Sequence, residues 1–116
     1  MKRSVQFYRT EDGKCYIEKF LDSLPAKTSQ KVTWVLNLIE ELDYVPDKFF
    51  KKLTGTDDIW ECRIKVKSDI FRILCFFHKD KVVILTHGFQ KKTQKTPREE
   101  IEKAEILKKD YLRRFK

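Results

Sequence analysis

The fold is decided by residues 59–89, which read IWECRIKVKSDIFRILCFFHKDKVVILTHGF. The stretch contains three runs that are rich in β-branched and aromatic residues, and these are Ile59–Val66, Ile70–His78 and Lys81–Phe89. Such runs are typical of strands, and the short polar segments at Lys67–Asp69 and Lys79–Asp80 are typical of tight turns. The sequence therefore predicts a three-stranded antiparallel meander.

The residues before the meander predict one strand and two helices. Ser4–Tyr8 alternates apolar and polar residues, as expected of a short N-terminal strand. Apolar residues then recur at helical spacing over Lys14–Ser23 and again over Ala26–Leu42, with Pro25 as the break between them. Because this break is so short, we expect the two helices to form an antiparallel hairpin that covers the sheet.

The segments that flank the meander predict a loop and a last helix. Phe49–Asp58 contains a glycine and paired aspartates, which indicate a loop. Thr96, Pro97 and Glu99 form a capping-box pattern, with Thr96 as the N-cap of a C-terminal helix. The apolar face of that helix would comprise Ile101, Ala104, Leu107, Tyr111 and Phe115. This order of elements predicts one small α+β domain over residues 1–116.

The chain carries a net charge of +8 with a pI near 9.4, so a polyanion is the first class of partner to consider. Residues 90–116 hold ten Lys or Arg against five Asp or Glu, which concentrates the excess in the C-terminal quarter. A lysine-rich helix that only faces solvent would give the same balance. Charge alone therefore leaves nucleic-acid binding and a solvated helix both open.

Cysteine and histidine usage gives no sign of disulfides or of a metal site. Cys15, Cys62 and Cys75 are odd in number and lack CxxC spacing, and His78 and His87 are the only histidines. We therefore expect reduced thiols in a cytoplasmic protein, with no metal and no cofactor. The N-terminus has no apolar leader, and no stretch approaches the roughly 18 apolar residues of a membrane helix, so we expect neither export nor insertion.

Strand alternation and turn lengths predict which polar side chains of the meander share a face. The first turn places Arg63 opposite Arg72, and a two-residue second turn places Arg72 opposite His87. Glu61 joins this face, whose other residues would be the apolar Leu74, Phe76, Val83 and Leu85. Two adjacent arginines repel unless an anion offsets them, so the patch predicts a phosphate site. The alternative is an internal ion pair between Glu61 and one arginine, with nothing bound.

The patch has the residue types that RNA cleavage without a metal requires. In such a reaction the 2′-hydroxyl is the nucleophile, so the protein must position the strand, move protons and neutralise the phosphate. Arg63 and Arg72 suit the last role, because a guanidinium group matches two phosphate oxygens and stays charged. The candidates for the proton transfers are Lys91, Lys92, His87 and Glu61. Phe89 would stack a base, and Lys95 would add a charge in the same loop.

A set of residues spread along the chain occurs in a specific order that is typical of one protein superfamily. The set comprises Lys52, Leu53, Gly55, Ile59, Trp60, Glu61, Arg63, Phe71, Arg72, Ile73, Leu74, Leu85, His87, Gly88, Phe89, Lys91, Lys92, Thr93, Thr96, Pro97, Ala104 and Tyr111. Together they resemble the RelE/ParE superfamily of bacterial toxins, and more closely its HigB-like branch, which includes phage Gp49-like proteins. The resemblance covers nearly the whole chain and implies a small RelE-like domain.

The resemblance also implies a function and partners. It implies a toxin of a type II toxin–antitoxin system, an endoribonuclease that inhibits translation by cutting mRNA without a metal, generally in the ribosomal A site. The implied partners are mRNA on the ribosome and a helix-turn-helix antitoxin encoded nearby.

Individual residues receive roles from the same resemblance. Arg63 and Arg72 match the strand arginines of the family, and Lys91–Lys92 match the basic loop after the last strand. Lys52 matches by its place in a loop and would contact RNA. In RelE-type toxins a C-terminal tyrosine contributes to the site, but Tyr111 lies in the apolar stripe of the last helix, so we assign it no catalytic role.

Two other functions fit the same features. A ParE-like protein that blocks DNA gyrase would share the fold. A nucleic-acid-binding module without catalysis would bind RNA with a strong salt dependence and yield no product. At the level of residues, His87 and Phe89 would fit equally well as packed sheet residues, and Lys91 and Lys92 as charges that only position a phosphate.

Overall fold

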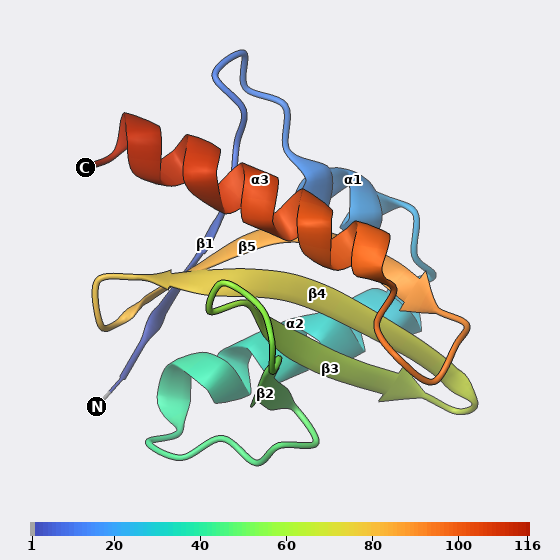
Figure 1. The fold of residues 1–116 in the computed structure, drawn as a ribbon. Coiled ribbons are helices and arrows are strands. Elements are labelled where there is room, and N and C mark those ends of the chain that lie inside the picture. Colours follow the sequence, from blue (N-terminus) through green and yellow to red (C-terminus); the bar gives the residue numbers. More distant parts are fainter. Residues whose placement is uncertain (1) are drawn as a thin grey trace.

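A computed structural model describes residues 2–116 of the chain (Figure 1). In chain order the elements are β1 (Ser4–Phe7), α1 (Tyr16–Asp22), α2 (Ala26–Glu41), β2 (Phe50–Lys52), β3 (Trp60–Val66), β4 (Asp69–His78), β5 (Val82–Lys91) and α3 (Arg98–Arg114). The predicted N-terminal strand, pair of helices, meander and C-terminal helix are all present. The predicted α+β class is therefore confirmed.

The strands form one five-stranded sheet in the order β1-β5-β4-β3-β2. Strands β3, β4 and β5 are the antiparallel meander, whereas β1 pairs with β5 in parallel. A parallel pair needs a long connection between its strands, and α1 and α2 lie within that connection on one face of the sheet. Helix α3 lies across the other face, so the sheet is covered on both sides (Figure 1).

The predicted loop over residues 49–58 is wrong in part, because it contains β2. Phe50–Lys52 pairs antiparallel with Trp60–Cys62 at the edge of β3. Phe50 is buried, and its ring stacks on that of Trp60 with 4.8 Å between the ring centroids. Only one of the three residues of β2 is buried, so no alternating pattern marks this strand in the sequence.

Two apolar cores lie on the two faces of the sheet. The core under α1 and α2 includes Ile17, Val32, Val35, Ile39, Cys62, Ile64, Ile73, Cys75, Val83 and Leu85. The core under α3 includes Tyr8, Ile59, Leu74, Phe76, Ile84, Ala104 and Leu107. Successive residues of β4 therefore point to opposite cores, as strand geometry requires.

Helix α1 packs closely on β5 at Gly88. A Cβ atom added at Gly88 would lie 2.5 Å from the Cδ2 atom of Phe20, so only glycine leaves room for that ring. The chain reverses after α1, and Figure 1 shows α2 running in roughly the opposite direction, as predicted for the pair.

The register of the first hairpin confirms the prediction, but that of the second does not. In the first hairpin Arg63 lies opposite Arg72. In the second, Arg72 lies opposite Phe89, and not opposite His87 as predicted. Directly opposite residues share a face, so Arg63, Arg72 and Phe89 all lie on the α3 side of the sheet.

Two irregularities of one residue each cause the difference. The connection between β4 and β5 comprises residues 79–81, which is one residue more than predicted. Further along, Thr86 forms a β-bulge, and its hydroxyl donates to a backbone carbonyl of β4 at 2.9 Å. Each irregularity reverses the faces of the residues after it, so together they return His87 to the predicted face. Val83 and Leu85 lie between them and face the opposite core, contrary to the prediction.

The three cysteines are buried free thiols. The sulfur atoms of Cys62 and Cys75 are 3.9 Å apart. Residues 2–116 contain no group of three or more His, Cys, Asp or Glu side chains placed to hold a metal ion. Of the helices in this described part of the chain, none has the length and apolar character needed to cross a membrane.

Candidate nucleic-acid interface

An open groove lies where β3, β4 and the end of β5 meet the loop after β5, and it has a volume of about 570 Å³. Its lining residues are Arg63, Ser68, Ile70, Arg72, Lys91, Lys92, Thr93 and Gln94. The fold thus brings together the two strand arginines and the lysine pair that the sequence singled out. This surface is termed the arginine groove below.

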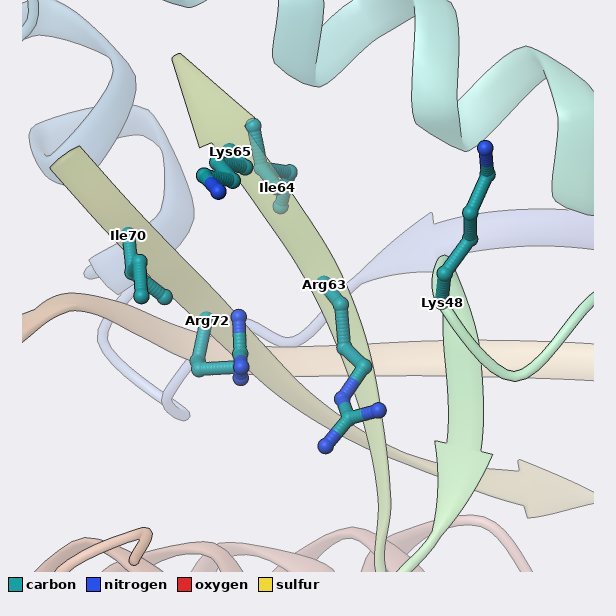
Figure 2. Close-up of a pocket in the computed structure, with 6 residues that line it drawn as sticks. All are labelled: Lys48, Arg63, Ile64, Lys65, Ile70 and Arg72. Atoms are coloured by element: carbon teal, nitrogen blue, oxygen red, sulfur yellow. The ribbon is translucent and has the colours of Figure 1, made fainter. Parts of the chain in front are cut away.

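A smaller depression of about 210 Å³ continues from the arginine groove along β3 (Figure 2). It is lined by Lys48, Arg63, Ile64, Lys65, Ile70 and Arg72. Figure 2 shows Arg63 and Arg72 reaching from the neighbouring strands β3 and β4, while the side chain of Lys48 points away from them. Both arginines line both depressions, so the basic surface is continuous.

The carboxylate of Glu61 connects the two arginines and is only 1% exposed. Nε of Arg63 donates to Oε1 of Glu61 at 3.0 Å, and the hydroxyl of Thr96 donates to Oε2 at 2.7 Å. Nε of Arg72 lies 3.4 Å from Oε1 and forms an ion pair without hydrogen-bond geometry. The internal ion pair that the sequence left open is therefore present, and it exists beside an open groove.

Thr96 does not cap α3, contrary to the prediction. The helix begins at Arg98, and Pro97 precedes it with no side-chain cap. The hydroxyl of Thr96 is bonded to Glu61 instead. A buried carboxylate is costly without hydrogen bonds, and this cost exceeds the roughly 1 kcal/mol that an N-cap contributes.

Burial changes the acidity of the cations in the arginine groove. Burial lowers the pKa of Arg72; the negative charge of Glu61 opposes this shift, and the positive charge of Arg63 adds to it. The guanidinium group nevertheless stays charged at neutral pH. Burial, and then the positive charge of Arg72, lowers the pKa of the Lys91 ammonium group. A lower pKa yields more neutral amine near pH 7, and it makes the ammonium form a better proton donor. These electrostatics suit Lys91 to proton transfer.

His87 is buried in the sheet and does not line the arginine groove. Its Nδ1 lies 3.0 Å from the hydroxyl of Thr86, and its Nε2 lies 3.0 Å from Oε1 of Glu100 on α3. Burial, and then the charge of Lys103, lowers the pKa of His87, while Glu100 opposes both. The histidine thus connects β5 to α3, which matches its alternative interpretation as a packed sheet residue.

The predicted RNA contacts Phe89, Lys52 and Lys95 line neither depression. Phe89 is half-buried against the core under α3, and its ring stacks on that of His87 with 5.9 Å between centroids. Lys52 forms an ion pair of 2.8 Å with an aspartate beside β2. Lys95 is exposed in the loop before α3. Phe89 lies opposite Arg72 in the sheet, and its packing fits a core residue.

Tyr111 lies at the end of β4 that is farther from Arg72. Its hydroxyl is 3.0 Å from Nδ1 of His78, and its ring packs edge-on against that of Phe76. This position agrees with its assignment to the apolar stripe of α3 and keeps the phenol out of the arginine groove.

Sequence reasoning missed the residues that extend the basic surface toward α2. A further depression of about 470 Å³, termed the Trp34 groove, is lined by Lys31, Trp34, Lys48, Phe49, Arg63, Lys65 and Lys67. The signal that could have marked it is Trp34, which lies outside the buried stripe of α2. An aromatic side chain on the polar face of a helix is often part of a binding surface.

Comparison with known proteins gives a family and a fold. The family described as phage derived protein Gp49-like (DUF891) matches residues 19–109. No curated protein matches the chain. Among solved structures, the chain is similar to a chain of the archaeal RelE-RelB complex from Pyrococcus horikoshii OT3. The two are 23% identical, the match covers 76% of this chain and 93% of that chain, and the TM-score is 0.51.

The structural likeness supports a RelE-like fold, and the family match spans most of the chain. The predicted Gp49-like relation is thereby confirmed, and the likeness to the solved structure agrees with the predicted RelE-like fold. The chain belongs to the phage-derived Gp49-like family.

Proposed function

We propose that the chain is the toxin of a type II toxin–antitoxin system, and that it inhibits translation by cutting mRNA on the ribosome. The arginine groove is the observation that carries the proposal, because two guanidinium groups held by Glu61 lie beside Lys91 and Lys92. Guanidinium groups match phosphate oxygens, and an ammonium group can move a proton. Membership of the Gp49-like family supports the toxin role.

Cleavage in this proposal proceeds through the 2′-hydroxyl of the RNA, so the reaction needs no metal-bound water. The 2′-oxygen attacks the adjacent phosphorus and expels the 5′-oxygen, which leaves a 2′,3′-cyclic phosphate. A base takes the proton of the 2′-hydroxyl, and an acid returns a proton to the leaving oxygen. Arg63 and Arg72 neutralise the charge that grows on the phosphate, and Lys91 and Lys92 are the candidates for the proton transfers.

Glu61 and His87 act as positioning residues in this proposal. Glu61 is buried and already accepts hydrogen bonds from Arg63 and Thr96, so its role is to hold the guanidinium groups. His87 lies outside the groove and contacts Glu100, so its role is to hold α3 against the sheet.

We also propose an antitoxin partner. The similar Pyrococcus chain belongs to a RelE-RelB complex, and a toxin must be silenced in the cell that makes it. A neighbouring reading frame with a helix-turn-helix pattern would identify the partner, and copurification of the two products would test it. Action on ribosomes also places the toxin in the cytoplasm.

The test of the proposed function is induction in growing cells followed by mapping of mRNA 5′ ends. The wild type should create new 5′ ends within coding regions, and Arg72→Ala and Lys92→Ala should each reduce them by about 100-fold or more. Lys109→Ala is the matched control, because Lys109 is exposed on α3, does not line the groove, and should leave cleavage unchanged. Intact transcripts during growth arrest would reject the proposal. Inhibition of purified gyrase with normal translation would favour the ParE-like alternative.

A further inference from the structure

We propose that the Trp34 groove holds the nucleotide next to the scissile one, with its base stacked on Trp34 and its phosphate among the surrounding lysines. This inference rests on the endoribonuclease function proposed above. It adds to that site a subsite for single-stranded RNA.

The Trp34 groove is continuous with the arginine groove. Arg63 lines both of them, and Lys48 and Lys65 line both the Trp34 groove and the depression drawn in Figure 2. An RNA strand with a phosphate at Arg63 therefore meets the Trp34 groove with its next nucleotide. The volume of about 470 Å³ falls within the roughly 300–1,000 Å³ range of ligand pockets.

The backbone of β3 leaves this side open. Strand β2 pairs with β3 only as far as Cys62, and within residues 2–116 no strand pairs with Ile64–Val66 on this side. The exposed Lys65 and Lys67 lie along that free edge. Lysines on a free edge discourage pairing with another strand, so a ligand that carries negative charge is a better match than an added strand.

All charged side chains that line the Trp34 groove are cations. They are Lys31, Lys48, Arg63, Lys65 and Lys67. The salt bridges formed by residues 2–116 include Arg63 but none of these four lysines. Four cations that form no ion pair with the described residues favour a polyanion as the occupant of the groove.

Trp34 supplies the surface that distinguishes a nucleotide from a simple anion. The side chain is 46% exposed, although α2 buries its apolar stripe against the sheet. The ring of Phe49 meets the indole edge-on at 5.4 Å between centroids, which fixes its orientation. The ammonium group of Lys31 lies 4.6 Å from the centroid of the same indole. A base can take the place of this flexible side chain, whose charge can then turn to a phosphate, as in other single-strand sites.

An acidic peptide would also meet the cations, but RNA is favoured for a geometric reason. The groove shares Arg63 with the proposed centre of phosphate chemistry, so an RNA bound at one extends into the other. A peptide bound in the Trp34 groove would have no reason to extend into the arginine groove.

The test measures the binding of single-stranded RNA hexamers to the purified protein. Trp34→Ala should weaken binding by roughly 10-fold or more, the loss typical of one stacked base, and Trp34→Phe should retain most of the affinity. Tyr44→Ala is the matched control, because Tyr44 is 76% exposed and does not line the groove. Trp34 and Trp60 are the only tryptophans, so in Trp60→Phe the RNA should quench the remaining indole fluorescence. This measurement applies even where Trp34→Ala does not fold.

Cleavage of mRNA on ribosomes separates this inference from the proposed function. Trp34→Ala should raise the concentration of substrate needed for half-maximal cleavage and change the maximal rate little, whereas Arg72→Ala should reduce cleavage by about 100-fold or more. The inference alone would be overturned if Arg72→Ala is inactive but Trp34→Ala binds RNA as tightly as the wild type does. Failure of RNA to quench the fluorescence of Trp34, again with inactive Arg72→Ala, would have the same meaning. The inference would also be overturned if Trp34→Ala weakens the binding of an acidic antitoxin peptide but leaves the affinity for RNA unchanged. If the wild type cleaves no mRNA, the proposed function is overturned. In that case, weaker RNA binding by Trp34→Ala than by the wild type would still assign the groove to RNA.

Discussion

Glu61 holds both arginines of the groove through one buried carboxylate. A buried charge is costly unless it is paired and hydrogen-bonded, so Glu61 and Arg72 depend on each other. The hydroxyl of Thr96 occupies the second carboxylate oxygen and fixes its orientation. The guanidinium groups are therefore held in place before any ligand arrives, which is the condition for electrostatic stabilisation of a transition state.

Removing the charge of Glu61 should destabilise the fold. Glu61→Gln is expected to lower the free energy of unfolding by roughly 3 kcal/mol, because it leaves the buried Arg72 without its counter-charge. Urea denaturation would measure the change. Glu41→Gln is the matched control, because Glu41 forms an exposed ion pair with Lys2 whose loss should cost less than about 1 kcal/mol. Equal losses in the two variants would contradict the role assigned to Glu61.

Helix α3 is held on the sheet by polar contacts from several segments. His87 of β5 contacts Glu100, and Nζ of Lys108 donates to the backbone carbonyl of Asp57 at 2.6 Å. Lys91 is the last residue of β5, and Lys92 begins the loop that connects β5 to this helix. Contacts that position α3 therefore also position the lysines of the arginine groove.

His87 should make the attachment of α3 depend on pH. Burial, and then Lys103, lowers the pKa of His87 in the folded protein, so the unfolded chain, with a pKa of about 6.5, binds the proton more readily. The stabilisation is complete above about pH 6.5 and is lost as the pH falls through the lower folded pKa. His87→Gln should therefore lose less stability than the wild type on acidification from about pH 7 to about pH 5. Thermal unfolding at each pH would measure this, and parallel curves for the two proteins would contradict it.

Eight of the lysine and arginine side chains line two adjoining grooves of the folded molecule. The cations come from α2, the loop before β2, both strands of the first hairpin and the segment after β5. Charges that are scattered along the chain thus act on one surface. Binding of a polyanion to such a surface releases counterions and weakens as salt increases.

The salt dependence of RNA binding should report which lysines contact phosphates. Lys65→Ala and Lys67→Ala should each reduce the slope of log K against log salt by about 0.7, since each removes one contact with a single strand. Lys109→Ala should leave the slope unchanged. Fluorescence anisotropy over a series of KCl concentrations would measure it, and equal slopes for all variants would place the RNA elsewhere.

Local sequence was sufficient for the helices, the meander and the central pair of functional residues. Periodicity reflects the backbone geometry of a few neighbouring residues, so the runs within residues 59–89 could be assigned to strands. The two-residue turn of the first hairpin set the register that places Arg63 opposite Arg72. The lysine pair follows the last strand directly, so its place near the arginines could also be predicted.

Tertiary packing decided the features that join distant parts of the chain. The bond from Thr96 to Glu61 spans 35 residues and replaces the predicted cap. The bulge at Thr86 and the strand β2 each depend on a neighbouring strand, and the Trp34 groove exists because α2 packs beside β3. No local pattern encodes such contacts, because a buried polar group bonds to whichever partner the fold brings within reach.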